Sequence, residues 1–343
     1  MDCEGCTLKL KSFLRICDDQ QQLLEFLKSH DVIQKSVICS SCGEPATFDN
    51  RKLKWRCQKT KKVKKGHKIQ KISCSFSITI RKGTWFENAN ISIEAACTLI
   101  GYFVTMNPPR QKFLETELEM SSRSIVDWCN FIREALLSWS IENSKQIGGP
   151  NCIVEIDEAK FGKRKYHRGR VIDGQWLFGG FERESKELFV IAVPDKSTAT
   201  LLSVIKTNVL PGTTIMSDCW KAYNCLDTEG FQHLTVNHNY NFVDPDTGTH
   251  TQNIERIWRE VRANIPRYGR SEYHMDSYIA GFYFKRKYPD HTQRFHQIFN
   301  IISLDNKLKQ NNATGLKSVL FRTKIGPFKG YHIFLTLKDL ARL

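Results

Sequence analysis

The feature that most constrains this chain is a pair of strand-like segments that each lead into an acid. In residues 213–258 the run TTIMS leads directly into Asp218, and upstream the apolar run in CIVEIDEAK leads into Asp157 and Glu158. A carboxylate at the end of a buried strand is costly unless it is paired or binds a metal. We therefore expect the two strand ends to meet at one functional site.

A third acid, Glu255, lies on a helical segment that follows these strands. Asn253 and Glu255 flank the apolar face of this segment on opposite sides, so only one of them is expected to point at the other acids. We choose Glu255, because a third anionic ligand offsets more of the charge of a divalent cation, and we keep Asn253 and His250 as alternates. The apolar face has the i, i+3, i+4, i+7 spacing of a helix and consists of Ile254, Ile257, Trp258 and Val261.

Residues 148–270 show the element order of an RNase H-like α/β core. In that fold the first and fourth strands are neighbours, which would bring Asp157 and Asp218 together. Glu155 shares a strand face with Asp157, whereas Glu158 takes the other face and would support the site from there. The order begins with three strands at 152–160, 175–183 and 187–194, followed by a helix at 197–209 and a strand at 213–218. A helical segment up to 223, a strand at 232–238 and a final helix at 253–265 complete it.

The three acids form a candidate catalytic set because Mg²⁺ and Mn²⁺ prefer carboxylate oxygens. A single Asp is more often a surface carboxylate. Here, however, 60 residues separate Asp157 from Asp218 and 36 separate Asp218 from Glu255, and each acid lies at an element end. We therefore predict that these three residues bind a divalent metal.

Residues 35–86 are predicted to form a zinc ribbon. Cys39 and Cys42 lie in a CxxCG motif, and Cys57 and Cys74 complete four thiolates, the ligand set of a closed structural zinc site. Sixteen residues separate the second pair, which we explain as a hairpin extension. His67 could replace one cysteine, but we rank it below Cys74.

The chain is strongly basic, with a net charge of +15 and a pI near 9.3. Thirteen Lys or Arg and no acid lie between residues 51 and 82, and six lie in the eleven residues 160–170. Solvated charge is the alternative for each run, but we favour DNA phosphates as the partner; a nuclear import signal could overlap the first run. The predicted contacts are Lys61, Lys62, Lys64 and Lys65 in the ribbon, and Lys163, Arg164, Lys165, Arg168 and Arg170 beside the acids.

Residues 87–147 are predicted to form a helix-turn-helix-like region. Two helices would meet at a tight turn at 119–121, with Ser121 or Ser122 capping the second helix and Arg123 facing outward toward DNA. A plain helical bundle is the alternative. The predicted buried face of the second helix consists of Ile125, Val126, Trp128, Cys129, Ile132, Leu136 and Leu137.

The two ends of the chain carry weaker signals. Residues 1–34 form an N-terminal helical lead, in which Cys3 and Cys6 make a CxxC motif with only Cys17 nearby; we interpret them as free thiols and keep a second zinc site as the alternative. Residues 271–343 form a C-terminal helical tail, whose helices would cover the core. No apolar run is long enough to cross a membrane, and no export signal is found, so we expect a protein that is not secreted and has reduced cysteines.

An ordered set of motifs resembles Merlin-type DDE transposases and their bacterial insertion-sequence relatives. The resemblance covers residues 20–300, departs in the long lysine-rich insert of the ribbon, and leaves the role of Asp246 and of residues 248–251 undefined. The motifs are CSSCG, WRC, GTWF, EIDEAKFGKRKYHRGR, WLFGGFER, SDCWKAY, VNH and THTQNIERIW.

This resemblance implies a DNA transposase with Asp157, Asp218 and Glu255 as its acidic triad. Two Mg²⁺ or Mn²⁺ ions about 4 Å apart would activate the attacking oxygen and stabilise the leaving one, first for hydrolysis at the element ends and then for strand transfer. Double-stranded DNA, as terminal repeats and target, would be the partner, and pairing of two ends implies a homodimer or higher oligomer. The location would be the nucleus in a eukaryote and the cytoplasm otherwise.

Two other functions are kept as alternatives. The first is a host-adopted, transposase-derived protein that binds DNA without catalysis. The second, weaker alternative is an RNase H-like nuclease acting on RNA.

Overall fold

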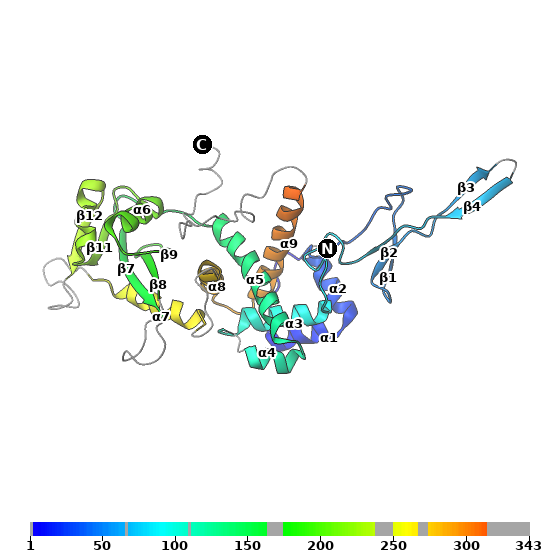
Figure 1. The fold of residues 1–343 in the computed structure, drawn as a ribbon, viewed down its shortest axis with the longest axis horizontal. Helices are drawn as coiled ribbons and strands as arrows, with labels where there is room; N and C mark the ends of the chain where they lie inside the picture. The colour runs from blue at the N-terminus through cyan, green and yellow to red at the C-terminus, as the bar shows by residue number, and fades with distance from the viewer. Residues whose placement is uncertain are drawn as a thin grey trace. The chain divides into compact units, whose positions relative to one another are not determined.

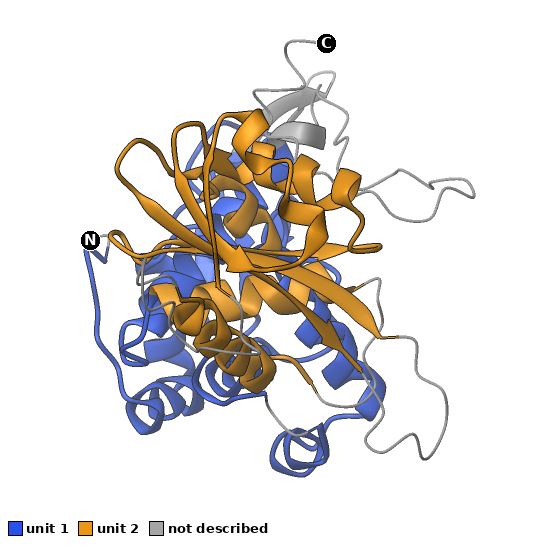
Figure 2. Cartoon of the chain, turned by 90° about the vertical axis from the view of Figure 1, so that its left-hand side faces the viewer, with its two compact units in different colours: residues 1–135, 288–323 blue, residues 136–287, 324–343 orange. Residues whose placement is uncertain are grey.

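The chain divides into two compact units in the computed structural model. The first comprises residues 1–135 and 288–323 and the second residues 136–287 and 324–343 (Figure 2). The described residues are 3–65, 68–108, 111–162, 174–236, 250–266 and 274–313.

A five-stranded mixed sheet forms the centre of the second unit. Its strand order is β12-β11-β7-β8-β9, in which β7, β8 and β9 are antiparallel neighbours, and β11 pairs parallel with both β7 and β12 (Figure 1). This order is that of the RNase H-like fold, so the predicted fold class is confirmed. The strands are β7 (Ile153–Phe161), β8 (Gln175–Glu182), β9 (Leu188–Val193), β11 (Thr214–Asp218) and β12 (Gln232–Val236).

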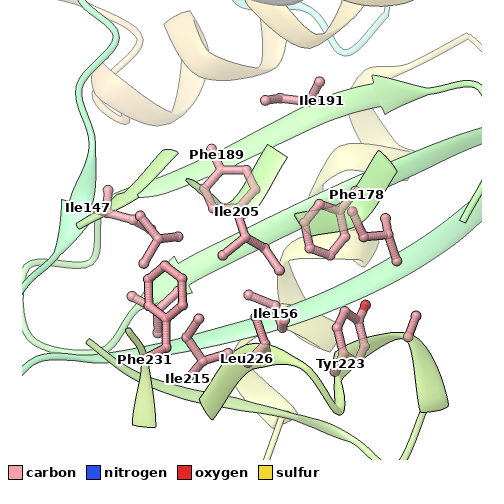
Figure 3. Close-up of a cluster of buried hydrophobic side chains, with 14 of the residues drawn as sticks. Ile147, Ile156, Phe178, Phe189, Ile191, Ile205, Ile215, Tyr223, Leu226 and Phe231 are labelled. Atoms are coloured by element: carbon pink, nitrogen blue, oxygen red, sulfur yellow. The ribbon is translucent and has the colours of Figure 1, made fainter. Parts of the chain in front are cut away.

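The alternation of side chains along β7 separates two apolar clusters, one on each face of the sheet. Val154 and Ile156 face a cluster that includes Tyr223 and residues of α6 (Thr198–Asn208), as Figure 3 shows for Ile156 and Tyr223. Ala159 and Phe161 face a second cluster built with α7 (Gln252–Asn264) and α8 (Met275–Lys287). A small parallel pair, β6 (Ile147–Gly148) and β10 (Val209–Leu210), also lies in this unit.

Two local expectations for this unit are corrected. Asp157 is not at the tip of its strand, because β7 continues to Phe161 through its pairing with β8. The helical segment predicted to reach residue 223 is only the short 3₁₀ helix η1 (Lys221–Tyr223), and a second 3₁₀ helix, η2 (Leu226–Glu229), follows it. The second of these ends at Gly230, whose φ of 89° is the left-handed conformation that favours glycine.

A buried carboxylate, Glu155, joins the sheet to the start of α7. Its side chain is 0% exposed and accepts hydrogen bonds from the backbone N–H groups of Asn253 and Ile254 at 2.9 and 3.1 Å. Arg183 Nε lies 2.7 Å from the same carboxylate and supplies a balancing charge. An acid at the N-terminal end of a helix also interacts favourably with the helix dipole, so Glu155 fixes the position of α7 on the sheet.

The first unit contains the ribbon and most of the remaining helices. A three-stranded sheet pairs β1 (Thr47–Asp49), β2 (Lys54–Arg56) and β5 (Ser77–Thr79). The basic insert forms the predicted hairpin, with β3 (Thr60–Lys65) antiparallel to β4 (Lys68–Ser73). The helices are α1 (Leu10–Asp18), α2 (Gln20–Ser29), α3 (Ile93–Thr105), α4 (Gln111–Leu118), α5 (Ser122–Glu142), which extends into the second unit, and α9 (Arg294–Ala313).

The predicted helix pair with its tight turn is present as α4 and α5. Glu119 has a φ of 50°, and the Ser121 hydroxyl accepts a hydrogen bond from Ser124 N at 3.1 Å, so Ser121 is the cap. The predicted buried face is wrong at Val126, which is 42% exposed because it lies beside the apolar stripe, whereas Ala135 is fully buried. The other predicted positions are buried, except for Leu137, which is partly buried.

The two C-terminal helices belong to different units. Helix α8 shares the cluster beneath α7, as expected of a helix that covers the core. Helix α9 belongs to the first unit instead, where Phe295 stacks on Phe13 with ring centroids 4.5 Å apart. No helix in the described part of the chain is long and apolar enough to span a bilayer.

We predict that Glu155→Gln lowers the free energy of unfolding by about 3 kcal/mol, because it leaves the largely buried Arg183 without a balancing charge. Urea unfolding followed by tryptophan fluorescence measures this change. The matched control is Glu187→Gln, an exposed acid whose ion pair with Lys145 is 3.9 Å long, with an expected change within about 0.5 kcal/mol. Equal effects of the two variants would contradict the anchoring role of Glu155.

Candidate functional site

Asp157 and Asp218 lie on neighbouring parallel strands. The register pairs Ile215 with Val154 and Met216 with Glu155, so two residues further along Asp218 lies beside Asp157. Since paired residues of parallel strands share a face, and Ile215 and Val154 both face the α6 cluster, the two acids lie on the opposite face, toward α7. The structure therefore brings the two strand acids together, on the face that carries α7.

Helix α7 makes a direct contact with this pair. The indole Nε1 of Trp258 donates a hydrogen bond to Asp157 Oδ2 at 2.9 Å. Gly179 is the β8 residue opposite Asp157, and a Cβ added there would lie 3.0 Å from the Trp258 ring. The missing side chain at Gly179 thus makes room for the indole that orients Asp157.

The third acid and its two alternates occupy different places. Glu255 is in the first turn of α7, three residues before Trp258, which places it one turn away on the same side of the helix, with an exposed side chain. Asn253 donates its amide to Glu155 Oε1 at 2.7 Å, and His250 Nδ1 lies 3.5 Å from the same oxygen. Both alternates therefore contact the anchor Glu155.

The carboxylates of Asp157, Asp218 and Glu255 do not form a compact ligand set in this structure. Among the described residues, the groups of three or more ligand atoms that lie within 4.8 Å of one another do not include these three acids. The two strand acids and the helix acid line one region of the site, without closing around a common point.

Burial gives Asp157 an unusual protonation equilibrium. Burial, together with the nearby charges of Glu158 and Asp218, raises the pKa of Asp157 to about 7, although the Trp258 hydrogen bond favours the ionised form. A divalent cation would offset this concentrated negative charge. The donor set of carboxylate oxygens also fits Mg²⁺ or Mn²⁺.

Glu158 lies on the other face of β7, away from Asp157. Its Oε2 accepts a hydrogen bond from the Tyr223 hydroxyl at 2.6 Å, and Lys196 Nζ lies 3.6 Å from Oε1. Tyr223 is 1% exposed, so it is a core residue, whereas Trp220 is 40% exposed and has Lys196 Nζ 3.7 Å from its ring centroid. Of these two aromatic residues, only Trp220 presents surface to a partner.

The four ribbon cysteines converge. The sulfurs of Cys39 and Cys74 are 3.4 Å apart, as are those of Cys42 and Cys57, and all four lie within 4.8 Å of one another. The turn after Cys39 is closed by a hydrogen bond from Gly43 N to Cys39 O at 2.9 Å. Cys74 therefore completes the group despite the inserted hairpin, and four thiolates suit a tetrahedral zinc ion.

The predicted DNA contacts are only partly visible. Lys61, Lys62, Lys64 and Lys65 lie on β3, whose backbone is described, and the Arg123 side chain is 93% exposed at the start of α5. His67 and the second group of contacts, Lys163, Arg164, Lys165, Arg168 and Arg170, lie outside the described residues.

Two residues of this site escaped the sequence analysis. Trp258 was assigned to the apolar face alone, and Arg183 was read only as the end of a strand. The signal for Trp258 was its position three residues after Glu255, which places an indole N–H beside an expected acid. For Arg183 no local signal existed, because its partner Glu155 lies on another strand.

Comparison with known protein families agrees with this geometry. Residues 147–287 match the family model of the ISXO2-like transposase domain. The matched family is one of transposase domains. The match covers less than half of the chain and falls within the second unit.

A curated relative points in the same direction. An uncharacterised transposase-like protein of Haemophilus influenzae is 24% identical over 94 residues, which are 27% of this chain and 75% of that protein. The two similarities support the predicted transposase class. Neither of them names the Merlin type.

Solved structures give weaker similarities. The catalytic core domain of BIV integrase is 16% identical with a TM-score of 0.28, over 46% of this chain and 97% of that one. The catalytic core domain of HTLV-2 integrase in complex with magnesium, in its dimeric form, is 15% identical with a TM-score of 0.27, over 40% and 88%. At these values the likeness carries no argument, and the fold assignment rests on the strand order.

We predict that Asp157→Asn stabilises the metal-free protein at neutral and higher pH. The folded-state pKa of about 7 lies above the ordinary 3.8, so the contribution of Asp157 to stability is full below about pH 4 and is lost as the pH rises through 7. The variant lacks this loss, so at pH 8 its free energy of unfolding should exceed that of the wild type by on the order of 3 kcal/mol. Thermal unfolding at several pH values without divalent cations measures the difference.

The same variant tests metal binding. Mg²⁺ or Mn²⁺ should raise the melting temperature of the wild type and of the control Glu187→Gln, because a ligand that binds only the folded state stabilises it. Asp157→Asn should not respond. An equal response of all three proteins would show that the cations bind elsewhere.

Proposed function

We propose that this chain is a Merlin-type DDE transposase that cleaves DNA at element ends and joins them to target DNA. The observation that carries the proposal is the placement of Asp157 and Asp218 side by side on parallel strands, beneath a helix whose first turn holds Glu255. This arrangement lies in the domain that is similar to ISXO2-like transposase domains.

Asp157, Asp218 and Glu255 would hold Mg²⁺ or Mn²⁺ in this proposal. Ions bound there supply polarisation of the scissile phosphate and activation of the attacking oxygen. Glu255 is preferred over Asn253 and His250 because both alternates contact Glu155. Glu255 also adds a third negative charge, which offsets more of the charge of a divalent cation.

The neighbouring residues position these acids. Trp258 orients one oxygen of Asp157 and leaves the other available as a ligand atom. Glu155 and Arg183 hold the start of α7, and therefore Glu255, at a fixed height on the sheet. A ligand set supported in this way loses little conformational freedom when metal and DNA bind.

Double-stranded DNA is the proposed partner, as terminal repeats and as target. The thirteen Lys or Arg of residues 51–82, the exposed Arg123 and the basic residues 163–170 would supply phosphate contacts. The ribbon, held by a zinc ion at its four cysteines, and the α4–α5 helix pair would place these basic residues against the DNA. Two element ends must be held together for joining, so we propose a homodimer or higher oligomer.

We predict that purified protein with Mn²⁺ joins element ends to a target plasmid. The donor is a plasmid that carries the coding sequence with its native flanking DNA, and sequencing of the junctions reports the products. Asp157→Asn, Asp218→Asn and Glu255→Gln should each lower the yield of junctions at least about 100-fold, because catalytic groups that act as a unit fail together. Glu187→Gln should retain the wild-type yield.

DNA binding by the same proteins is measured as a function of salt. All four variants should bind the flanking DNA with the same steep salt dependence as the wild type. Salt-sensitive binding by a wild type that yields no junctions would overturn the proposal and support the adopted DNA-binding protein. Loss of junctions in Asn253→Ala but not in Glu255→Gln would overturn the assignment of the third acid.

A further inference from the structure

Four metal-ligating side chains far apart in the sequence meet in the first unit. Cys3 and Cys6 precede α1, His30 follows α2, and His296 lies in the first turn of α9. Their ligand atoms all lie within 4.8 Å of one another. No residue of the acidic site or of the ribbon takes part, so the group is independent of both.

Four of the six distances between these ligand atoms are close to those of a tetrahedral metal site. Cys3 Sγ and Cys6 Sγ lie 3.5 and 3.9 Å from His296 Nδ1, Cys6 Sγ lies 3.5 Å from His30 Nε2, and the two nitrogens are 3.2 Å apart. Zn–S bonds of about 2.3 Å and Zn–N bonds of about 2.0 Å at the tetrahedral angle require about 3.6 Å between sulfur and nitrogen and about 3.3 Å between nitrogens. We propose that Cys3, Cys6, His30 and His296 bind a second structural zinc ion.

The ring nitrogens that face away from this group have partners of their own. His30 Nδ1 carries the proton and donates it to Phe26 O at 2.8 Å. The unprotonated Nε2 therefore points its lone pair at the group. His296 Nε2 lies 2.8 Å from the side-chain amide of Asn300. The atom placed there is Asn300 Nδ2, and the oxygen and nitrogen of an amide are assigned from their hydrogen-bond partners. Zinc binding at Nδ1 requires the flipped amide, whose oxygen accepts from His296 Nε2–H. Ligating histidines are held in this manner by hydrogen bonds from their second nitrogen.

The two histidines of the group are buried, the two cysteines are partly buried, and backbone contacts hold the N-terminal segment in place. His30 and His296 are 4% and 8% exposed. The N-terminal segment is tied on both sides, by a hydrogen bond from Cys3 N to Ser29 O at 2.9 Å and one from Leu8 N to Thr292 O at 2.8 Å. Four protein ligands leave no open coordination site, which is the arrangement of a structural zinc ion.

A hydrogen-bonded cluster without metal is the competing explanation. In this explanation one imidazole N–H donates a hydrogen bond across the 3.2 Å gap between His30 Nε2 and His296 Nδ1. It predicts that the four groups bind no metal ion. The tetrahedral distances favour the metal, because a thiol is a weak donor and gains little from lying close to two imidazoles. Two sulfur and two nitrogen ligands select zinc among the common divalent ions.

We predict that the full chain purified with zinc carries one ion in the ribbon and one in this second group. Cys3→Ser/Cys6→Ser and, separately, Cys39→Ser/Cys42→Ser should each halve the zinc content measured by mass spectrometry of the metals. The double removal should abolish it. Zinc content that is unchanged by the first variant and lost entirely in the second would overturn the proposal.

A change of ligand type separates metal binding from folding. His296→Cys should keep the second zinc ion, because thiolate replaces imidazole as a ligand, whereas His296→Gln should lose it although an amide can still form hydrogen bonds. The controls His274→Gln and Cys219→Ser change the same residue types outside the group. Retention of the ion in His296→Gln would contradict the proposal.

Cobalt spectra give a readout that is independent of catalysis. In the Cys39→Ser/Cys42→Ser background, Co²⁺ should show the tetrahedral absorption of a two-thiolate site, and His296→Cys should strengthen the sulfur-to-metal band. Absence of a tetrahedral spectrum in that background would overturn the second site. DNA joining is not part of this test, so its result stands apart from that of the transposase proposal.

Discussion

The buried charge of Glu155 is the constraint on which the second unit depends. A fully buried carboxylate is tolerated only with a balancing charge and several hydrogen bonds. Arg183 from the end of β8 and the first backbone N–H groups of α7 supply them. Because those donors belong to two other elements, satisfying one carboxylate sets the position of the helix on the sheet.

Asp157, the proposed metal ligand, lies where a charge is unfavourable. The side chain lies two residues from Glu155 on the same face, yet it receives an indole hydrogen bond in place of a balancing cation. Its raised pKa records the cost of charge at that position. In the proposed metal site, a bound cation would offset this electrostatic cost, and part of the stability given up by the folded protein would be regained on binding.

The sequence predicted the second unit well because its signals are local. Apolar runs located all five strands, and their order predicted that Asp157 and Asp218 would be neighbours. The extension of β7 to Phe161 depends on pairing with β8, which no local pattern reports. The 3₁₀ helices were missed because so short an apolar segment does not distinguish helix types.

Side-chain partnerships across long separations were the part that the sequence could not supply. The four ribbon cysteines lie together as predicted, because a CxxC motif is a local signal of a metal site. Cys3 and Cys6 carry the same motif, but the histidines that face them are single residues at positions 30 and 296, without any spacing that links them. Likewise, the contact of Arg183 with Glu155 depends on the register between β7 and β8, which no local pattern reports.

The discontinuous first unit has a consequence for how the chain is made. Translation releases residues 136–287 before α9 exists, so the RNase H-like unit can fold while the first unit still lacks its last helix. Until α9 emerges from the ribosome, Phe13 and Phe26 have no Phe295 or Phe299 to pack against. A nascent chain in this state exposes aromatic surface for the time needed to synthesise about half of the protein, at the 5–20 residues per second typical of ribosomes.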